Sequence, residues 1–242
     1  MENNIYSGTS KSNAYNEIDA LLKEEEKDQK PGPLDSHEDE RIRWFSRWFK
    51  DTPTIKDSFN HVYTWRMAGA QTCFLGDANS LLVKPDFFAE VLDFIKRHFP
   101  DIKRFTIYGR TKSAAMMDLD DLKTFKAAGL NRIHFGIESG SDRVLKFMKK
   151  GETAKDHIEG CLKTRQAGIS PSVYIMPGLG GTSFSEEHAY ETAKVLSMSK
   201  PDYVRIRTLE IFSGTPLMKA KASNEFIEAN EEQIVKEIRI II

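Results

Sequence analysis

The stretch AGLNRIHFGIESGSDRVLKFMKKG, residues 128–151, contains one strand–turn–helix unit. Its apolar, β-prone run RIHFGI at 132–137 predicts a strand. Asp142 to Lys149 has a helical pattern that stops at Gly151, a residue type suited to a left-handed helix end. Between the two elements lies Glu138-Ser139-Gly140-Ser141, directly after the strand. The unit therefore predicts polar side chains at the carboxyl end of a strand.

Comparable units recur from Gln71 onward. The predicted strands are TCFLG at 72–76, RFTIYG at 104–109, RIHFGI at 132–137, SVYIMPG at 172–178 and YVRIRTL at 203–209. The predicted helices are Phe87–His98, Leu119–Ala128 with Asp118 as N-cap, Asp142–Lys149, Thr153–Ala167, and Ser185–Ser199 with Ser183 or Ser185 as N-cap. Alternation at roughly 30 to 40 residues per unit means right-handed βαβ units and a parallel sheet.

The number of strands limits the choice of α/β architecture. A complete eightfold barrel takes roughly 250 residues, more than the part of the chain from Gln71 to Ile242 provides. The sequence predicts either a partial TIM-type barrel or an open doubly wound sheet. In both architectures, ligands meet the carboxyl ends of the strands.

Residues 1–54 differ in character from the rest of the chain. A weak helical pattern and a charge run precede Pro31-Gly32-Pro33, and a second helical face then carries the aromatic residues Trp44, Phe45, Trp48 and Phe49. We expect an irregular helical segment at 1–54 and a barrel domain at 55–242. The aromatic helix either covers the barrel edge or docks a protein partner. The predicted last helix, Ala229–Ile242, is apolar to its end, and we expect the chain to be cut short there.

The charge balance argues against a polyanion-binding protein. Lys plus Arg number 35 and Asp plus Glu 36, for a net charge of −1. No apolar run approaches the length of a membrane span, and the N-terminus lacks a signal-peptide pattern. We therefore expect a soluble, cytoplasmic protein that takes a small-molecule ligand and neither nucleic acid nor a membrane.

Cysteine usage restricts the metal chemistry. The chain has only Cys73 and Cys161, so a disulfide framework is excluded. Two thiolates are also fewer than iron–sulfur or structural zinc sites usually need. His157 and Cys161 lie four residues apart on one predicted helix, which makes a poor metal site, and Cys73 is expected in the core. No metal ligand is predicted.

Polar and glycine residues follow the predicted strands. They are Gly76, Asp77, Glu138, Ser139, Gly178, Gly180, Gly181, Arg205 and Arg207. A rim with two carboxylates, arginines and a glycine-rich turn could hold a zwitterionic or anionic small molecule. Alternatively, Asp77 and Ser139 only cap helices and the glycines only turn the chain. A third interpretation makes Asp77 and Glu138 the acid and base of a cluster-independent lyase or hydrolase.

Several of these strings together resemble a known family. They are FLGDANSL at 74–81, the stretch at 128–151, AGISPSVYIMPGLGG at 167–181, SEEHAYETAKVL at 185–196, and PDYVRIRTL followed by SGTPL at 201–217. In order and spacing they resemble the core of the radical S-adenosylmethionine (radical SAM) superfamily. The similarity is closest to iron–sulfur oxidoreductases related to the anaerobic coproporphyrinogen oxidase type.

The resemblance implies a fold, two cofactors and a set of contacts. The family has a partial (β/α)6 barrel with a [4Fe-4S] cluster held by CxxxCxxC after its first strand, and S-adenosylmethionine binds that cluster. It implies that Gly76-Asp77 contacts the methionyl amine and that Glu138 and Ser139 contact ribose or methionyl groups. It places Gly178, Gly180 and Gly181 near adenine, and it makes Arg205 and Arg207 candidates for a carboxylate of cofactor or substrate.

The sequence departs from the family at the cluster. Neither the first strand nor CxxxCxxC precedes Ile55, so that strand is missing or replaced by the helical segment. Without three thiolates the cluster has no anchor. We expect a family member that still binds S-adenosylmethionine or an adenosyl product but is inactive as an oxidoreductase. The alternative is a non-enzymatic barrel that binds a small anionic ligand, an adenosyl ligand or a protein.

Overall fold

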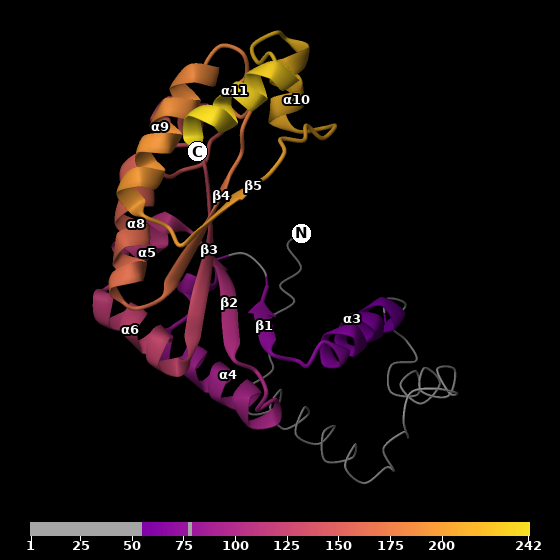
Figure 1. Cartoon of the computed structure of the whole chain (residues 1–242), viewed down its shortest axis with the longest axis vertical. Coiled ribbons are helices and arrows are strands. Elements are labelled where there is room, and N and C mark those ends of the chain that lie inside the picture. The colour runs from indigo at the N-terminus through magenta and orange to yellow at the C-terminus, as the bar shows by residue number, and fades with distance from the viewer. Residues whose placement is uncertain (1–54, 77–78) are drawn as a thin grey trace, which may run out of the picture. The chain divides into compact units, whose positions relative to one another are not determined.

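The computed structural model describes residues 55–76 and 79–242 (Figure 1). The chain divides into two compact units, Met1–Trp65 and Arg66–Ile242. The described residues begin with helix α3 (Ile55–Met67). The predicted helix with the aromatic residues lies outside the described residues. The region before Ile55, where the family's first strand is expected, lies outside them as well. The division of domains between residues 54 and 55 stays a prediction.

The second unit contains a sheet of five parallel strands. They are β1 (Thr72–Leu75), β2 (Arg104–Gly109), β3 (Leu130–Glu138), β4 (Ser170–Ile175) and β5 (Tyr203–Ile206). Their spatial order follows the sequence, β1-β2-β3-β4-β5, and all four pairings are parallel. A doubly wound sheet reverses its strand order partway, so that alternative is wrong. The fold is a partial TIM-like barrel, and its sheet is not closed within the described residues.

Helices follow the strands as the periodicity predicted. They are α4 (Pro85–His98), α6 (Leu119–Ala128), α7 (Asp142–Phe147), α8 (Ala154–Gln166), α9 (Ser185–Ser199) and α11 (Glu231–Ile241). Three short elements were not predicted from the sequence: α5 (Thr111–Met116), α10 (Pro216–Ala222) and the 3-10 turn η1 (Ser80–Leu82). None of the described helices is long and apolar enough to cross a membrane.

Several predicted boundaries were wrong for local reasons. β3 is longer than predicted at both ends. β4 begins two residues early and ends at Ile175, where a turn closed by Leu179 N–H on the Met176 carbonyl takes the chain away. β5 ends at Ile206, short of the predicted residue 209. α7 ends at Phe147 because Lys149 has a left-handed φ of 53°.

The N-cap predictions were only partly right. Asp118 occupies the N-cap position of α6, but its side chain caps no backbone amide. Phe184 is the N-cap residue of α9, so Ser183 and Ser185 are not. The Ser185 hydroxyl instead donates to Oε1 of Glu237 at 2.6 Å, which removes it from any capping role.

The two faces of the sheet differ because successive side chains of a strand point to opposite sides. One face is apolar, and its side chains on the three central strands are at most 1% exposed: Phe105, Ile107, Ile133, Phe135, Ile137, Val173 and Ile175. Figure 1 shows α4, α6, α8 and α9 along one side of the sheet. Burying each such side chain contributes about 1.5–3 kcal/mol. The opposite face, here called the open face, carries Phe74, Arg104, Thr106, Tyr108, Arg132, His134, Gly136, Ser170, Ser172, Tyr174, Tyr203, Arg205 and Arg207.

The helix layer contains one very close contact. A Cβ added to Gly160 in α8 would lie 2.2 Å from the backbone oxygen of Thr111 in α5. Two hydroxyl groups form hydrogen bonds beside this contact. Thr111 Oγ1 donates to Glu152, and Thr164 Oγ1 donates to the Gly160 carbonyl. The absence of a side chain at residue 160 therefore permits α5 and α8 to pack.

We predict that Gly160→Ala lowers the free energy of unfolding by at least about 1 kcal/mol, because the new methyl group overpacks a backbone contact. Helix propensity alone predicts a gain of about 1 kcal/mol for this change. Urea unfolding of both proteins measures the sign. Ser197→Ala, at an exposed position of α9, is the control and should be neutral or slightly stabilising. A more stable Gly160→Ala variant would contradict the close packing of α5 and α8.

Candidate functional site

Aromatic side chains gather around His134 at the middle of the open face. The imidazole ring centroid lies 5.7 Å from that of Phe74, 6.0 Å from that of Tyr108 and 5.7 Å from that of Tyr174. Phe74 and Tyr108 meet edge to face at 4.7 Å. These side chains come from four adjacent strands, and Tyr108 pairs directly with His134 in the register. His134 is only 6% exposed as a result.

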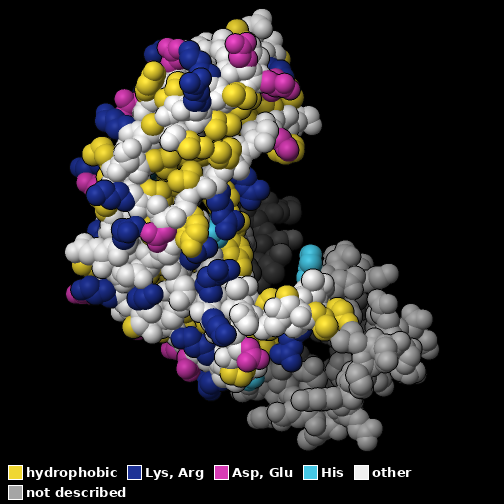
Figure 2. Space-filling view, viewed as in Figure 1, with side chains coloured by type: hydrophobic (Ala, Val, Ile, Leu, Met, Phe, Trp, Pro, Cys, Tyr) yellow, Lys and Arg dark blue, Asp and Glu magenta, His cyan; other side chains and the backbone are white. Residues whose placement is uncertain are grey.

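Arginines surround this aromatic cluster. The Arg132 guanidinium lies 3.8 Å from the ring centroid of Tyr203, a cation–π contact. Arg205 donates from Nη1 to the Tyr174 hydroxyl at 3.3 Å, and Arg207 lies 5.0 Å from the Tyr174 ring. Figure 2 shows Lys and Arg side chains gathered over this part of the second unit. The ion pairs of the described residues include none of these three arginines.

The positive charge acts on His134. Burial is the largest cause that lowers the pKa of its imidazole to about 4, and the nearby charges of Arg205, Arg132 and Arg104 contribute to the same shift. His134 is therefore neutral at physiological pH. Its Nδ1 is buried without a hydrogen-bond partner, as are Ser172 Oγ, Ser170 Oγ and Arg132 Nε. Buried polar atoms normally have partners, so these four atoms, which have almost no exposed surface, are an energetic cost in the packing of this face.

A strained residue ends the central strand. Glu138 has a φ of 62°, and the register of β3 against β4 shifts beside it. Its Oε1 accepts a hydrogen bond from Lys150 Nζ at 2.6 Å. A Cβ at Gly136 would lie 3.1 Å from Oε1 of Glu138 and 3.3 Å from Lys150 Nζ, so the missing side chain makes room for this ion pair. Such a left-handed residue costs of order 1–3 kcal/mol and points to a functional constraint.

A second polar network lies where β2 ends. The buried Glu152 carboxylate accepts hydrogen bonds from Thr111 Oγ1 at 2.9 Å, the Lys112 amide at 2.9 Å and Arg110 Nε at 3.3 Å. His157 Nδ1 lies 2.6 Å from Thr111 Oγ1, and burial lowers the pKa of this imidazole to about 4. His157 Nε2 is buried without a hydrogen-bond partner, but the other contacts join Thr111 and Lys112 of α5 to Glu152 and to His157 of α8, so the network fixes α5 against α8.

Ser139 belongs to a fully buried network. Its Oγ lies 2.8 Å from His188 Nδ1 on α9, and His188 Nε2 lies 3.8 Å from Oε2 of Glu237 on α11. The three side chains form a serine–histidine–carboxylate series, but each is at most 1% exposed. Burial lowers the pKa of His188 to about 4 and raises that of Glu237. No substrate can reach a nucleophile there, so the network is structural.

The glycine-rich turn packs against the protein itself. A Cβ at Gly180 would lie 2.8 Å from the Phe184 backbone oxygen, and one at Gly181 would lie 2.6 Å from that of Ile227. The Gly178 amide donates to Oε2 of Glu237 at 2.6 Å. All three glycines are buried. Internal packing therefore explains why glycine is needed at residues 180 and 181.

The two cysteines do not fit an iron–sulfur cluster. Cys73 is half-buried on β1, and burial raises the pKa of its thiol. Cys161 is fully buried in α8, and burial raises its pKa to about 12. Both shifts disfavour the thiolate that binds metal. Among the described residues, no three His, Cys, Asp or Glu side chains are grouped to hold a metal ion.

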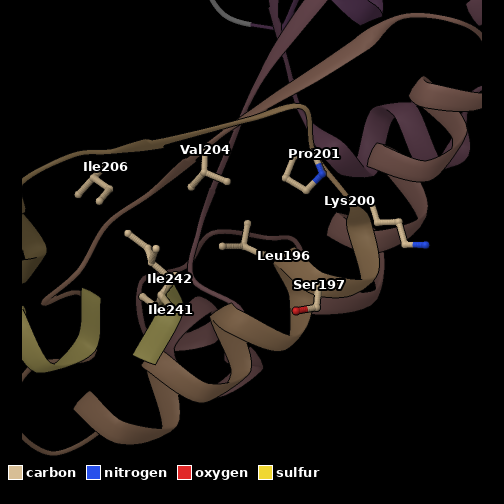
Figure 3. Close-up of a pocket in the computed structure, with 8 residues that line it drawn as sticks. All are labelled: Leu196, Ser197, Lys200, Pro201, Val204, Ile206, Ile241 and Ile242. Atoms are coloured by element: carbon tan, nitrogen blue, oxygen red, sulfur yellow. The ribbon is translucent and has the colours of Figure 1, made fainter. Parts of the chain in front are cut away.

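An apolar groove lies on the other side of the sheet. It has a volume of about 520 Å³ and lies between α9, β5 and the end of α11 (Figure 3). Its walls include Val204, Ile206 and Ile241, with Ser197 and Lys200 as the polar contributors. No convergent polar or acidic groups line it, so it is not the candidate site.

The structure distributes the predicted site residues over several places. Glu138 lies at the carboxyl end of the sheet, and Arg205 and Arg207 lie on the open face. Ser139 and the three glycines are buried beside α9. Gly76 is exposed after β1, and Asp77 lies outside the described residues. The remaining open-face residues were not predicted as site residues, although they alternate with apolar residues along each strand: Phe74, Arg104, Tyr108, Arg132, His134, Tyr174 and Tyr203.

A family model described as the radical SAM superfamily matches residues 33–193. Among curated proteins, the tRNA uridine(34) acetyltransferase of Methanocaldococcus infernus is 26% identical over 111 residues, 46% of this chain and 21% of that protein. The heme chaperone HemW of Bacillus subtilis is 24% identical over 135 residues, 55% of this chain and 35% of that protein. The matches thus cover about a third or less of these relatives.

Solved structures show the same fold. The archaeal Methanocaldococcus infernus Elp3 with an N-terminal deletion superposes with a TM-score of 0.57 at 17% identity, covering 74% of this chain and 47% of that one. Coproporphyrinogen III oxidase (HemN) from Escherichia coli gives a TM-score of 0.54 at 15% identity, covering 70% and 38%. At these sequence identities, both superpositions show similarity of the parallel α/β fold alone.

We predict that Arg205→Gln raises the pKa of His134 from about 4 toward its ordinary value of 6.5, because a repelling positive charge is removed from the imidazolium. Titration of the His134 ring protons by NMR measures the change, with the signal assigned by its loss in His134→Asn. Arg97→Gln, on the exposed side of α4, is the matched control and should leave the titration unchanged. An unaltered His134 titration in Arg205→Gln would show that this guanidinium does not face the imidazole.

Proposed function

The chain belongs to the radical SAM superfamily, and from this premise we propose that it binds an adenosyl ligand beside Glu138. The ligand is S-adenosylmethionine or a product derived from it. The observation that carries the proposal is the strained Glu138, whose carboxylate is held over Gly136 at the carboxyl end of the central strand. Carboxyl ends of parallel strands are where α/β proteins of this kind bind ligands.

The residues around Glu138 fit the methionyl part of that ligand. Lys150 contacts only Oε1 of Glu138, and the described residues donate no hydrogen bond to Oε2. A carboxylate with a free oxygen would accept from the ligand's ammonium group. Arg207, on the open face next to Tyr174, would take the ligand's carboxylate. These assignments keep two of the sequence-based candidates, Glu138 and Arg207, in a binding role.

The proposal gives this chain no redox step of its own. In the family, S-adenosylmethionine bound at a reduced [4Fe-4S] cluster supplies one-electron cleavage of its sulfonium group. The chain's own sulfur atoms cannot hold that cluster, because Cys73 and Cys161 are two thiols held on different layers of the fold with raised pKa values. What the described residues do is bind and orient a small molecule.

Two other functions remain predictions. An acid–base enzyme using Asp77 and Glu138 depends on Asp77, which lies outside the described residues. Docking of a protein through Trp44, Phe45, Trp48 and Phe49 concerns residues that are also outside them. The activities in the relatives' names do not enter the proposal, because the matches cover at most 35% of the curated proteins compared above.

We predict that anaerobic reconstitution of this chain with iron and sulfide gives no stoichiometric [4Fe-4S] cluster. The measurements are protein-bound iron, acid-labile sulfide and electron paramagnetic resonance after reduction. Cys73→Ser and Cys161→Ala should hold the same residual iron as the unaltered chain, since neither thiol is a ligand. A stoichiometric cluster that disappears in Cys73→Ser would overturn the assignment of both cysteines to packing roles.

We predict that Glu138→Gln weakens binding of S-adenosylmethionine about tenfold or more, because a charge-assisted hydrogen bond to the ammonium group is lost. Isothermal titration calorimetry measures the affinity, and thermal unfolding checks that the variant is folded. Glu159→Gln, at an exposed ion pair on α8, is the control and should bind like the unaltered chain. Equal affinities for both variants would refute the role of Glu138, and the absence of binding by the unaltered chain would refute the proposed function.

A further inference from the structure

The turn after β3 places Glu138 in a rare backbone conformation. The Ser139 amide donates to the Ile137 carbonyl at 2.7 Å, so Glu138 is the central residue of a three-residue γ-turn. Its φ of 62° is positive, and a positive φ belongs to the strained form of this turn. A residue in such a conformation keeps it only where the surrounding structure holds it. The contacts of the residues next to Glu138 therefore decide where its carboxylate lies.

Helix α9 contacts each of the three residues that follow Glu138. The hydrogen-bonded pairs are Ser139 Oγ with His188 Nδ1 at 2.8 Å, Gly140 N with Thr192 Oγ1 at 2.9 Å, and Ser141 Oγ with Glu187 Oε1 at 2.6 Å. A Cβ at Gly140 would lie 2.2 Å from the backbone oxygen of Glu191, so the turn and the helix also meet backbone to backbone. The position of the turn therefore depends on that of α9.

His188 forms the contact nearest to Glu138. Ser139 Oγ accepts a hydrogen bond from the Ser141 amide at 3.0 Å, which leaves its hydroxyl hydrogen for another acceptor. Burial lowers the pKa of His188 to about 4, so its imidazole is neutral at physiological pH and Nδ1 can be that acceptor. Neither Ser139 nor His188 has exposed surface, so water does not compete for the hydrogen bond. The residue next to Glu138 is thus held from inside the protein.

Helix α9 also supports the turn after β4. The Ser185 hydroxyl and the Gly178 amide each donate to an oxygen of Glu237 at 2.6 Å, so α11 joins that turn to α9. The two turns meet directly as well, because the Met176 amide donates to the Glu138 carbonyl at 3.0 Å. Both strand-end turns therefore depend on the same helix.

We propose that His188 is a positioning residue for ligand binding. Its hydrogen bond to Ser139 holds the γ-turn so that Oε2 of Glu138 meets the ammonium group of the ligand. His188 itself contacts no ligand, because it has no exposed surface. The proposal rests on the proposed function and adds to it a buried residue that determines how strongly the site prefers a ligand with an ammonium group.

A role of His188 in stability alone predicts a different result. Loss of packing would weaken the binding of every ligand of the site by a similar factor. Loss of the Glu138 position removes only the contact with the ammonium group, so a ligand without that group would bind as before. The ratio of the two affinities therefore separates positioning from packing.

The test compares S-adenosylmethionine with its desamino analogue, in which hydrogen replaces the amino group, by calorimetric titration of the full chain. We expect the unaltered chain to prefer S-adenosylmethionine about tenfold, which corresponds to about 1.4 kcal/mol. His188→Leu, which replaces the ring by an apolar side chain of similar volume, should reduce the preference to about twofold or less. A folded His188→Leu variant that keeps the full preference would overturn the proposal.

Two further variants test the hydrogen bond itself. His188→Asn places an amide group near the position of Nδ1 and should restore much of the preference, so equal ratios in the Asn and Leu variants would overturn the proposal. In the double variant His188→Leu with Glu138→Gln, the affinity for S-adenosylmethionine should equal that of Glu138→Gln alone, because the contact that His188 supports is already lost. Additive losses would likewise overturn it.

His157→Leu is the matched control. His157 also has no exposed surface, and its Nδ1 also lies beside a hydroxyl group, Thr111 Oγ1 at 2.6 Å, but it joins α8 to α5 and makes no contact with the turn after β3. We expect this variant to keep the preference for S-adenosylmethionine. An equal fall of the preference in His157→Leu and His188→Leu would mean a general effect of losing a buried histidine and would overturn the proposal.

Amide hydrogen exchange tests the turn without a ligand. The Ser139 amide closes the γ-turn and belongs to a buried residue, so its exchange depends on opening of the turn. His188→Leu should raise its exchange rate about tenfold relative to that of Phe135 in β3, and His157→Leu should not. An unchanged rate would overturn the positioning role even if S-adenosylmethionine binds. A faster rate in a chain that binds no S-adenosylmethionine would refute the proposed function and leave the hold of His188 on the turn established.

Discussion

The two-residue period of β3 and its neighbours is the constraint from which the rest of the second unit follows. Phe135 and Ile133 lie on the helix side with no exposed surface, so Arg132 and His134 must lie on the other side. A register slip of one residue would bury the arginines under α6 and α8 and expose the apolar core. The same periodicity therefore fixes the helix layer and the composition of the open face.

Parallel sheets normally have apolar residues on both faces because helices cover both. Here the open face is polar and aromatic, and its small buried residues are covered by long side chains from adjacent strands. Arg132 lies over Tyr203, and Arg205 reaches the Tyr174 hydroxyl. Such coverage leaves Ser172 and His134 buried but unpartnered. The chain thus keeps polar atoms in a dry position at a cost that a purely structural sheet would avoid.

Periodicity predicted the strands and most helices because each is a repeated local signal. It missed α5 because TKSAAM is too short for an apolar stripe and depends on Gly160 for its packing. It placed α9's cap on a serine because Ser185 has the right chemistry, but Glu237, 52 residues away, takes that hydroxyl. Caps and short helices depend on tertiary partners that a linear pattern does not contain.

The site residues also differ in whether a local sequence signal or a tertiary partner determines their place. Polar residues at predicted strand ends included Glu138, Arg205 and Arg207, which lie at the carboxyl end of the sheet or on the open face. The backbone strain at Glu138 is local to the turn after β3. The sequence does not show that the Ser139 hydroxyl contacts His188 or that the Gly180 backbone packs against Phe184, because both contacts depend on how α9 packs. His134 was not selected as a site residue, because it lies inside a strand and not at its end. The strings RFTIY (104–108) and RIHFG (132–136) alternate between the two faces of the sheet. Which face the helices cover becomes clear only from the structure.

In the proposed function, ligand recognition and redox chemistry depend on different parts of this scaffold. Recognition depends on which side chains the strand period places on the open face, and that period is fixed by the same packing that makes the fold stable. Redox chemistry depends on soft donors that packing does not require. Cys161 illustrates the difference: it fills core volume in α8 with its thiol held protonated, whereas Arg205 contributes nothing to the core and remains exposed. The charged and aromatic side chains of the open face therefore do not depend on sulfur ligands, because no cysteine takes part in the register of β3 against β2 and β4.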